Sequence, residues 1–172
     1  MDDKKILMQR LAIIRRIAKL AKDPGKTSIQ KIVYFLQSGL EVPLGYRFKM
    51  HHYGPYSDKL DGNLSLSDAM GIVEIKADSA GYGYHITPGK FQVEDVEPSM
   101  TWEEIDETIM NLAELELPQL ELLATIHFVQ SIRSRWDRKR VIMTVRRLKP
   151  KFSEPRIEKA YRDIEKMGFI KS

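Results

Sequence analysis

Residues 118–133 constrain the fold most strongly, because they are apolar on nearly every side of a helix. No apolar run in the chain reaches the roughly 18 residues that a membrane helix needs. A shorter helix that is apolar all round is usually the central helix of a packed core. We therefore expect a buried helix here, made by these apolar residues: Leu120, Leu122, Leu123, Ile126, Phe128, Val129 and Ile132.

Other segments repeat apolar residues at helical spacing and predict amphipathic helices. These segments are residues 5–21, 27–39, 101–112, 137–148 and 153–166. Two of them begin with a capping-box pattern, in which a hydroxyl and a carboxylate or amide three residues later satisfy free backbone donors. The two expected capping boxes are Thr27 with Gln30 and Thr101 with Glu104, and Ser153 is expected to cap the last helix.

The segments between the second and third of these helices predict β-structure and one weak helix. Residues 45–53 alternate in polarity and predict a short strand. Gly54-Pro55 is expected to open a helix, because proline suits a first helical turn, and this helix is expected to break near Asn63. Residues 71–75 and 82–87 predict a hairpin around the turn residues 78–81.

This order of elements predicts a fold that is mainly α with a small β-hairpin, of the α+β class. Residues 1–90 are expected to form a winged-helix unit, because their elements come in its order: two helices, a short strand, a third helix and a hairpin. Residues 91–117 form an acidic linker and a helix. Residues 118–172 are expected to form a second, helix-turn-helix-like unit of three helices.

Three motifs resemble the YwgA-like family, which is distantly related to the Panacea (SocA-like antitoxin) superfamily. They are KTSIQKIVYFL at 26–36, YRFKMHHYGPY at 46–56, and LKPKFS at 148–153 followed by IEKA at 157–160. The resemblance runs from Leu7 to Phe169, and its most specific part is the aromatic-Gly-Pro-Tyr turn at 53–56. It implies a fold more than an activity. Panacea relatives are described as antitoxins that bind partner proteins.

Charge is segregated along the chain although the net charge is only +4. Residues 91–132 sum to −10, whereas residues 133–151 sum to +8. Such asymmetry indicates either contact with nucleic acid or an acidic segment folded against the chain's own basic surface. We expect the second unit to contact DNA through these ten residues: Arg135, Arg138, Lys139, Arg140, Arg146, Arg147, Arg156, Lys159, Arg162 and Lys166.

The helix in the recognition position of the first unit is less suited to DNA. Its charged residues Asp58, Lys59, Asp61 and Asp68 sum to −2, and phosphates repel such a surface. We therefore expect this unit to serve structure or protein contact.

The histidines predict no catalytic or metal site. His51, His52, His85 and His127 have no zincin spacing, and the chain has no cysteine to complete a zinc set. A pairing of His51 or His52 with Ser57 or Asp58 is the one catalytic arrangement to consider, and His127 is expected to be a hydrogen-bonded core residue. We expect no cofactor and no enzymatic activity. The lack of cysteine and of a signal peptide favours a soluble protein of the reducing cytoplasm.

Two functions from different classes remain open. The first is a DNA-binding transcriptional regulator, expected to act as a homodimer because one short helix reads too little DNA. The second is an antitoxin-like module that binds a protein partner through the turn formed by Tyr53, Gly54, Pro55 and Tyr56 or through residues 91–121. Neither predicts a membrane partner.

Overall fold

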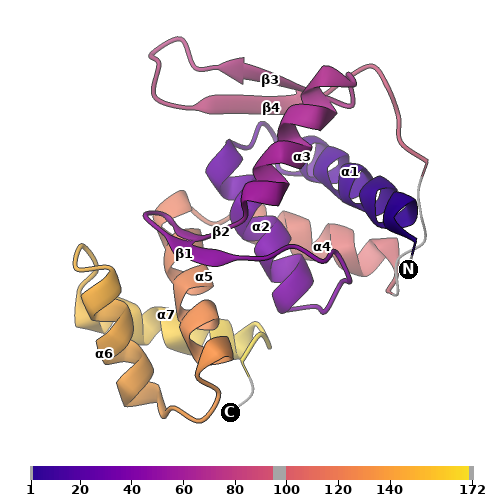
Figure 1. Ribbon diagram of the computed structural model, residues 1–172. Coiled ribbons are helices and arrows are strands. Elements are labelled where there is room, and N and C mark those ends of the chain that lie inside the picture. The colour runs from indigo at the N-terminus through magenta and orange to yellow at the C-terminus, as the bar shows by residue number, and fades with distance from the viewer. Residues whose placement is uncertain (1, 95–99, 171–172) are drawn as a thin grey trace.

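The computed structural model describes residues 2–94 and 100–170, and over these residues the chain forms seven helices and two antiparallel hairpins (Figure 1). The mainly helical α+β class is therefore confirmed, with one hairpin more than the sequence predicted. Among these described helices, none combines the length and the apolar character needed to span a bilayer.

The first two helices, α1 (Asp3–Leu20) and α2 (Lys26–Ser38), bury the apolar stripes that predicted them. The expected capping box of Thr27 and Gln30 is wrong. Gly25 is the N-cap of α2, and it makes no side-chain capping bond. The Gln30 amide instead lies in the interior, where it accepts from the Ser57 backbone N–H at 2.9 Å and donates to the Ser57 carbonyl at 3.0 Å.

A short hairpin replaces the strand predicted over residues 45–53. Its strands are β1 (Lys49–His51) and β2 (Gly54–Tyr56), with Met50 opposite Pro55. The helix predicted to start at Gly54-Pro55 starts later, as α3 (Asp58–Ala69), because Ser57 is its N-cap and accepts from the Leu60 N–H. This helix runs unbroken through Asn63, so the predicted break there is wrong.

The second hairpin agrees with the sequence prediction within two residues. It consists of β3 (Val73–Ala77) and β4 (Tyr84–Pro88), with Ile75 opposite Ile86. The Arg15 guanidinium fixes the base of this hairpin to α1 by donating to the carbonyls of Ile72 at 2.9 Å and Gly89 at 3.0 Å.

The second half of the chain contains α4 (Trp102–Ala113), α5 (Leu117–Ile132), α6 (Arg138–Leu148) and α7 (Glu154–Lys166). Helix α5 is central as predicted, since it contacts α2, β2, α6 and α7. Helices α6 and α7 lie at the end of the molecule opposite the β3–β4 hairpin (Figure 1). Helix α4 packs on α1 and α2, and one apolar cluster includes residues of all seven described helices. The division at residues 90 and 118 stays a prediction, and residues 95–99 of the expected linker lie outside the described part.

Helix α4 begins with the complete capping box that the sequence predicted. Thr101 Oγ1 accepts from the Glu104 N–H at 3.3 Å, and Glu104 Oε2 accepts from the Thr101 N–H at 3.1 Å. Ser153 is the N-cap of α7, but its side chain makes no capping hydrogen bond. Comparing these two N-caps therefore tests how much the capping hydrogen bond of Thr101 contributes to stability.

Thr101→Ala should lower the free energy of unfolding by about 1 kcal/mol, the usual contribution of an N-cap side chain. Ser153→Ala should have a smaller effect, because no capping bond is lost. Urea denaturation followed by circular dichroism measures both. Equal losses in the two variants would contradict the assigned role of the Thr101 hydroxyl.

Candidate functional site

The ten predicted nucleic-acid-binding residues lie on or just before α6 and α7. Arg138, Lys139, Arg140, Arg146 and Arg147 belong to α6, and Arg156, Lys159, Arg162 and Lys166 belong to α7. Arg135 lies in the turn before α6. All ten are exposed except Arg138, which is half-buried beside Tyr161. We call these ten residues the basic face.

Ion pairs occupy three members of the basic face. Arg138 lies 3.4 Å from Glu165, Arg146 lies 2.5 Å from Glu154, and Lys159 lies 2.7 Å from Asp163. Within the described residues, the other seven have no carboxylate within 4.0 Å. These seven are Arg135, Lys139, Arg140, Arg147, Arg156, Arg162 and Lys166.

The acidic segment binds other parts of the chain. Asp106 on α4 accepts two hydrogen bonds from Arg16 on α1, at 2.7 and 2.6 Å. Glu121 on α5 binds Lys149 and Lys151 in the connection between α6 and α7. The carboxylates that pair with the basic face come from α7 itself. The described part of the acidic segment thus leaves the basic face uncovered.

A groove of about 880 Å³ runs between α6 and α7. Residues that line it include Lys139, Ile142, Met143 and Arg147 from α6 and Glu158 from α7. The groove therefore combines exposed cations with some apolar surface.

Two of the four residues in the aromatic-Gly-Pro-Tyr turn are packed inside the protein. Gly54 and Pro55 are buried, whereas Tyr53 is exposed and Tyr56 is half-buried. Gly54 has φ +91°, and a Cβ there would lie 3.2 Å from Lys31 Cε and 3.3 Å from Thr125 Oγ1. Only glycine satisfies both the backbone conformation and the available space. Of the four residues predicted to bind a protein partner, Tyr53 presents the most surface.

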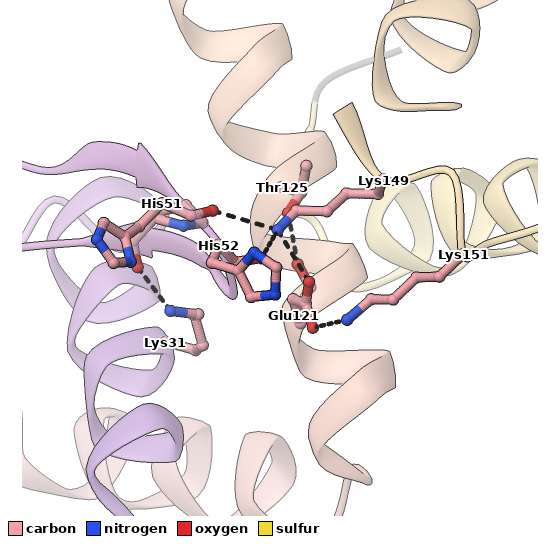
Figure 2. Close-up of polar contacts among 8 residues, drawn as sticks. Lys31, His51, His52, Glu121, Thr125, Lys149 and Lys151 are labelled. Atoms are coloured by element: carbon pink, nitrogen blue, oxygen red, sulfur yellow. Dashed lines mark hydrogen bonds and ion pairs between the residues drawn. The ribbon is translucent and has the colours of Figure 1, made fainter. Parts of the chain in front are cut away.

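A buried polar cluster that the sequence did not predict contacts this turn (Figure 2). Lys149 and Glu121 are 4% and 2% exposed, and Lys149 Nζ lies 3.0 Å from Glu121 Oε1. Lys149 Nζ also donates to the carbonyls of His51 and His52. Lys151 Nζ lies 2.8 Å from Glu121 Oε2, and Lys31 Nζ donates to the Pro55 carbonyl at 2.7 Å. One signal for it was available: Glu121 is a single acid inside the apolar stretch 118–133.

The buried Lys31 ammonium has a lowered pKa. Loss of hydration on burial lowers this pKa to about 8; the nearby Glu121 carboxylate raises it, and the charge of Lys149 lowers it further. Lys31 is therefore mostly protonated at neutral pH, although it is buried.

The histidines do not form the catalytic pairing that the sequence raised. The His51 ring stacks on Tyr56 with centroids 5.0 Å apart, and the His52 ring contacts Tyr53. Ser57 caps α3 and Asp58 binds Lys49 at 2.7 Å. Within the described residues, no group of three His, Cys, Asp or Glu side chains is placed to hold a metal ion.

Known proteins add no constraint to this geometry. No protein-family model matches the chain, and no curated protein matches it either. The YwgA-like resemblance therefore stays a prediction from the motifs.

Glu121→Gln should lower the free energy of unfolding by about 3–5 kcal/mol, because it leaves the buried Lys149 ammonium without a countercharge. Glu114→Gln is the matched control, since Glu114 is exposed. Urea denaturation of both variants checks the expectation. A Glu121→Gln loss no larger than that of the control would show that Glu121 does not compensate this buried charge.

His127 should make the stability of the protein depend on pH. It is buried, its Nδ1 lies 2.7 Å from the Tyr34 hydroxyl, and burial lowers its pKa to about 4 from 6.5. The unfolded chain binds the proton first as pH falls, so stability should drop between about pH 6.5 and 4 by about 3 kcal/mol. Unfolding measured across this range should show the drop, and His127→Gln should remove most of it. An unchanged pH dependence in the variant would contradict this role.

Proposed function

We propose that the protein is a non-enzymatic DNA-binding regulator that contacts the duplex through the basic face of α6 and α7. The observation that carries this proposal is the pairing pattern. Seven of the ten cations have no carboxylate partner in the described part of the chain, although the chain holds 24 acids. Exposed lysine and arginine side chains that no carboxylate neutralises can bind several phosphates and release their counterions.

The arrangement within α7 supports this role for the second unit. Lys159, Arg162 and Lys166 are spaced three and four residues apart, so they share a face of the helix, and all three are exposed. In our proposal, α6 and α7 act as a helix-turn-helix pair with α7 in the recognition position. A homodimer then supplies two such helices to the two halves of a DNA site.

The first unit has a structural role in this proposal. Its α3 carries more acid than base, and two of its three acids lie near lysines of the same unit. Asp58 binds Lys49 at 2.7 Å, and Asp61 lies 3.9 Å from Lys26. In our proposal, a winged-helix unit with this surface packs against α4 and α5 and does not contact DNA.

The antitoxin-like alternative has weaker support. Gly54 and Pro55 of the predicted contact turn are buried against Lys31, Thr125 and Glu121. At this turn a partner protein would reach mainly Tyr53 and part of Tyr56. As part of the same proposal, we place the protein in the cytoplasm.

A salt series of duplex binding tests the proposal. We expect affinity to fall steeply with salt, and a Lys139→Ala, Arg147→Ala, Arg162→Ala triple variant to reduce the log–log slope by about 3, roughly one unit for each lost phosphate contact. Fluorescence anisotropy with a labelled duplex gives the slopes. Arg138 is left intact because it pairs with Glu165 and stacks on Tyr161.

The matched control is a variant that loses three positive charges on α1. Lys4, Lys5 and Lys19 are exposed and lie outside the basic face, so their triple alanine variant should keep the slope of the unmodified chain. Absence of binding at low salt would refute the proposal. Equal effects of the two triple variants would show that only net charge matters and that the basic face is not the contact surface.

A further inference from the structure

A second cavity, which no residue of the basic face lines, lies between the two hairpins and the start of α2. It has a volume of about 740 Å³, which is in the range of small-molecule sites. Most of its lining comes from three parts of the chain: the first two turns of α2, the β1–β2 hairpin and the tip of the β3–β4 hairpin. Asp61 of α3 and Leu117 of α5 complete the lining.

A buried cation forms part of the wall. Lys31 is 1% exposed, and its only hydrogen bond among the described residues is the one to the Pro55 carbonyl. No carboxylate in that part of the chain lies within 4.0 Å of its ammonium, since Glu121 pairs with Lys149 and Lys151 instead. An ammonium has three donors, and the Pro55 carbonyl takes one of them. In our proposal the other two bind an anion in the cavity.

The entrance of the cavity adds a second cation and free backbone donors. Lys26 lies 4.4 Å from the Tyr84 ring centroid and 3.9 Å from Asp61, so it is only loosely held. The N-cap of α2 is Gly25, which leaves the first N–H groups of this helix without a side-chain acceptor. Such donors favour the phosphate of a ligand.

Aromatic rings from both hairpins complete the lining. Tyr53 and Tyr56 come from the β1–β2 hairpin, and Tyr82 and Tyr84 come from β4 and the turn before it. Tyr82 is 94% exposed, so its ring has almost no packing partner of its own. Rings in this position can stack on a planar heterocycle, as tyrosines do in sites for bases.

We propose that this cavity binds a nucleotide, with the phosphate on Lys31, Lys26 and the first turn of α2, and with the base against the tyrosines of the two hairpins. The nucleotide is either free or the 5′-phosphorylated end of a strand, because both present the same phosphate and base. The inference does not rest on DNA binding by α6 and α7, since no residue is shared.

Isothermal titration calorimetry with AMP, adenosine and inorganic phosphate tests the site. AMP should bind with a dissociation constant below about 1 mM and about tenfold more tightly than either adenosine or phosphate, because only AMP uses both halves of the cavity. No heat at millimolar AMP would overturn the proposal. Equal binding of phosphate and AMP would overturn it as well, because the tyrosines would then contribute nothing.

Variants locate the site. Lys26→Ala with Tyr84→Ala changes two partly exposed side chains and should weaken AMP binding at least about tenfold. Lys76→Ala is the control, because Lys76 is exposed on β3 and does not line the cavity. Lys31→Met should abolish AMP binding while circular dichroism shows a folded protein. If Lys31→Met unfolds the chain, the double variant decides alone: unchanged AMP binding in it refutes the assignment.

Two oligonucleotides distinguish the sources of the ligand. A short single strand with a 5′-phosphate and the same strand with a 5′-hydroxyl are titrated separately and then displaced with AMP. Preference for the phosphorylated end, with displacement by AMP, assigns the cavity to strand ends. Binding of AMP alone assigns it to free nucleotide.

Duplex binding in the Lys26→Ala, Tyr84→Ala variant should equal that of the unmodified chain. This measurement separates failure of the nucleotide proposal from failure of the DNA-binding proposal.

Discussion

The ion pair between Glu121 and Lys149 joins segments that are far apart in the sequence. Glu121 lies on the central helix α5, and Lys149 follows α6 and donates to the carbonyls of His51 and His52 at the turn of the β1–β2 hairpin. A buried ammonium without a countercharge is costly, so the presence of the carboxylate decides whether these three segments can pack together. Gly54 permits this approach, because its backbone conformation and the space around it exclude a side chain.

The periodic parts of this fold could be predicted from the sequence, whereas contacts across long separations could not. Helices α1 and α6 follow from the spacing of their apolar residues, and α5 follows from apolar residues on nearly every side. The Thr101 capping box depends only on neighbours three residues apart. The Gly54-Pro55 pair was misread because it suits both a helix start and a tight turn. Gln30 was misread because its true partner, Ser57, is 27 residues away.

The same limit applies to charge and to the candidate site. Helical spacing predicted which basic positions on α6 and α7 are exposed. It could not predict that the acidic segment leaves them uncovered. Many other cations of this basic chain are used inside the fold. Arg10 donates to the Leu44 carbonyl, Arg16 binds Asp106, and Lys31 binds the Pro55 carbonyl. Counts of lysine and arginine cannot separate these internal cations from the exposed ones, because the difference depends on which carbonyl or carboxylate folding brings near.

The contact between Lys149 and the β1–β2 hairpin also orders events during synthesis. Lys149 and the carbonyl of His51 are 98 residues apart, so the hairpin emerges from the ribosome long before the side chain that closes over it. Contacts of such separation form slowly, because a long loop must close first. Before α4 and α5 have emerged, α1 lacks its contacts with α4, and α2 lacks its contacts with both helices. The nascent chain then exposes apolar surface.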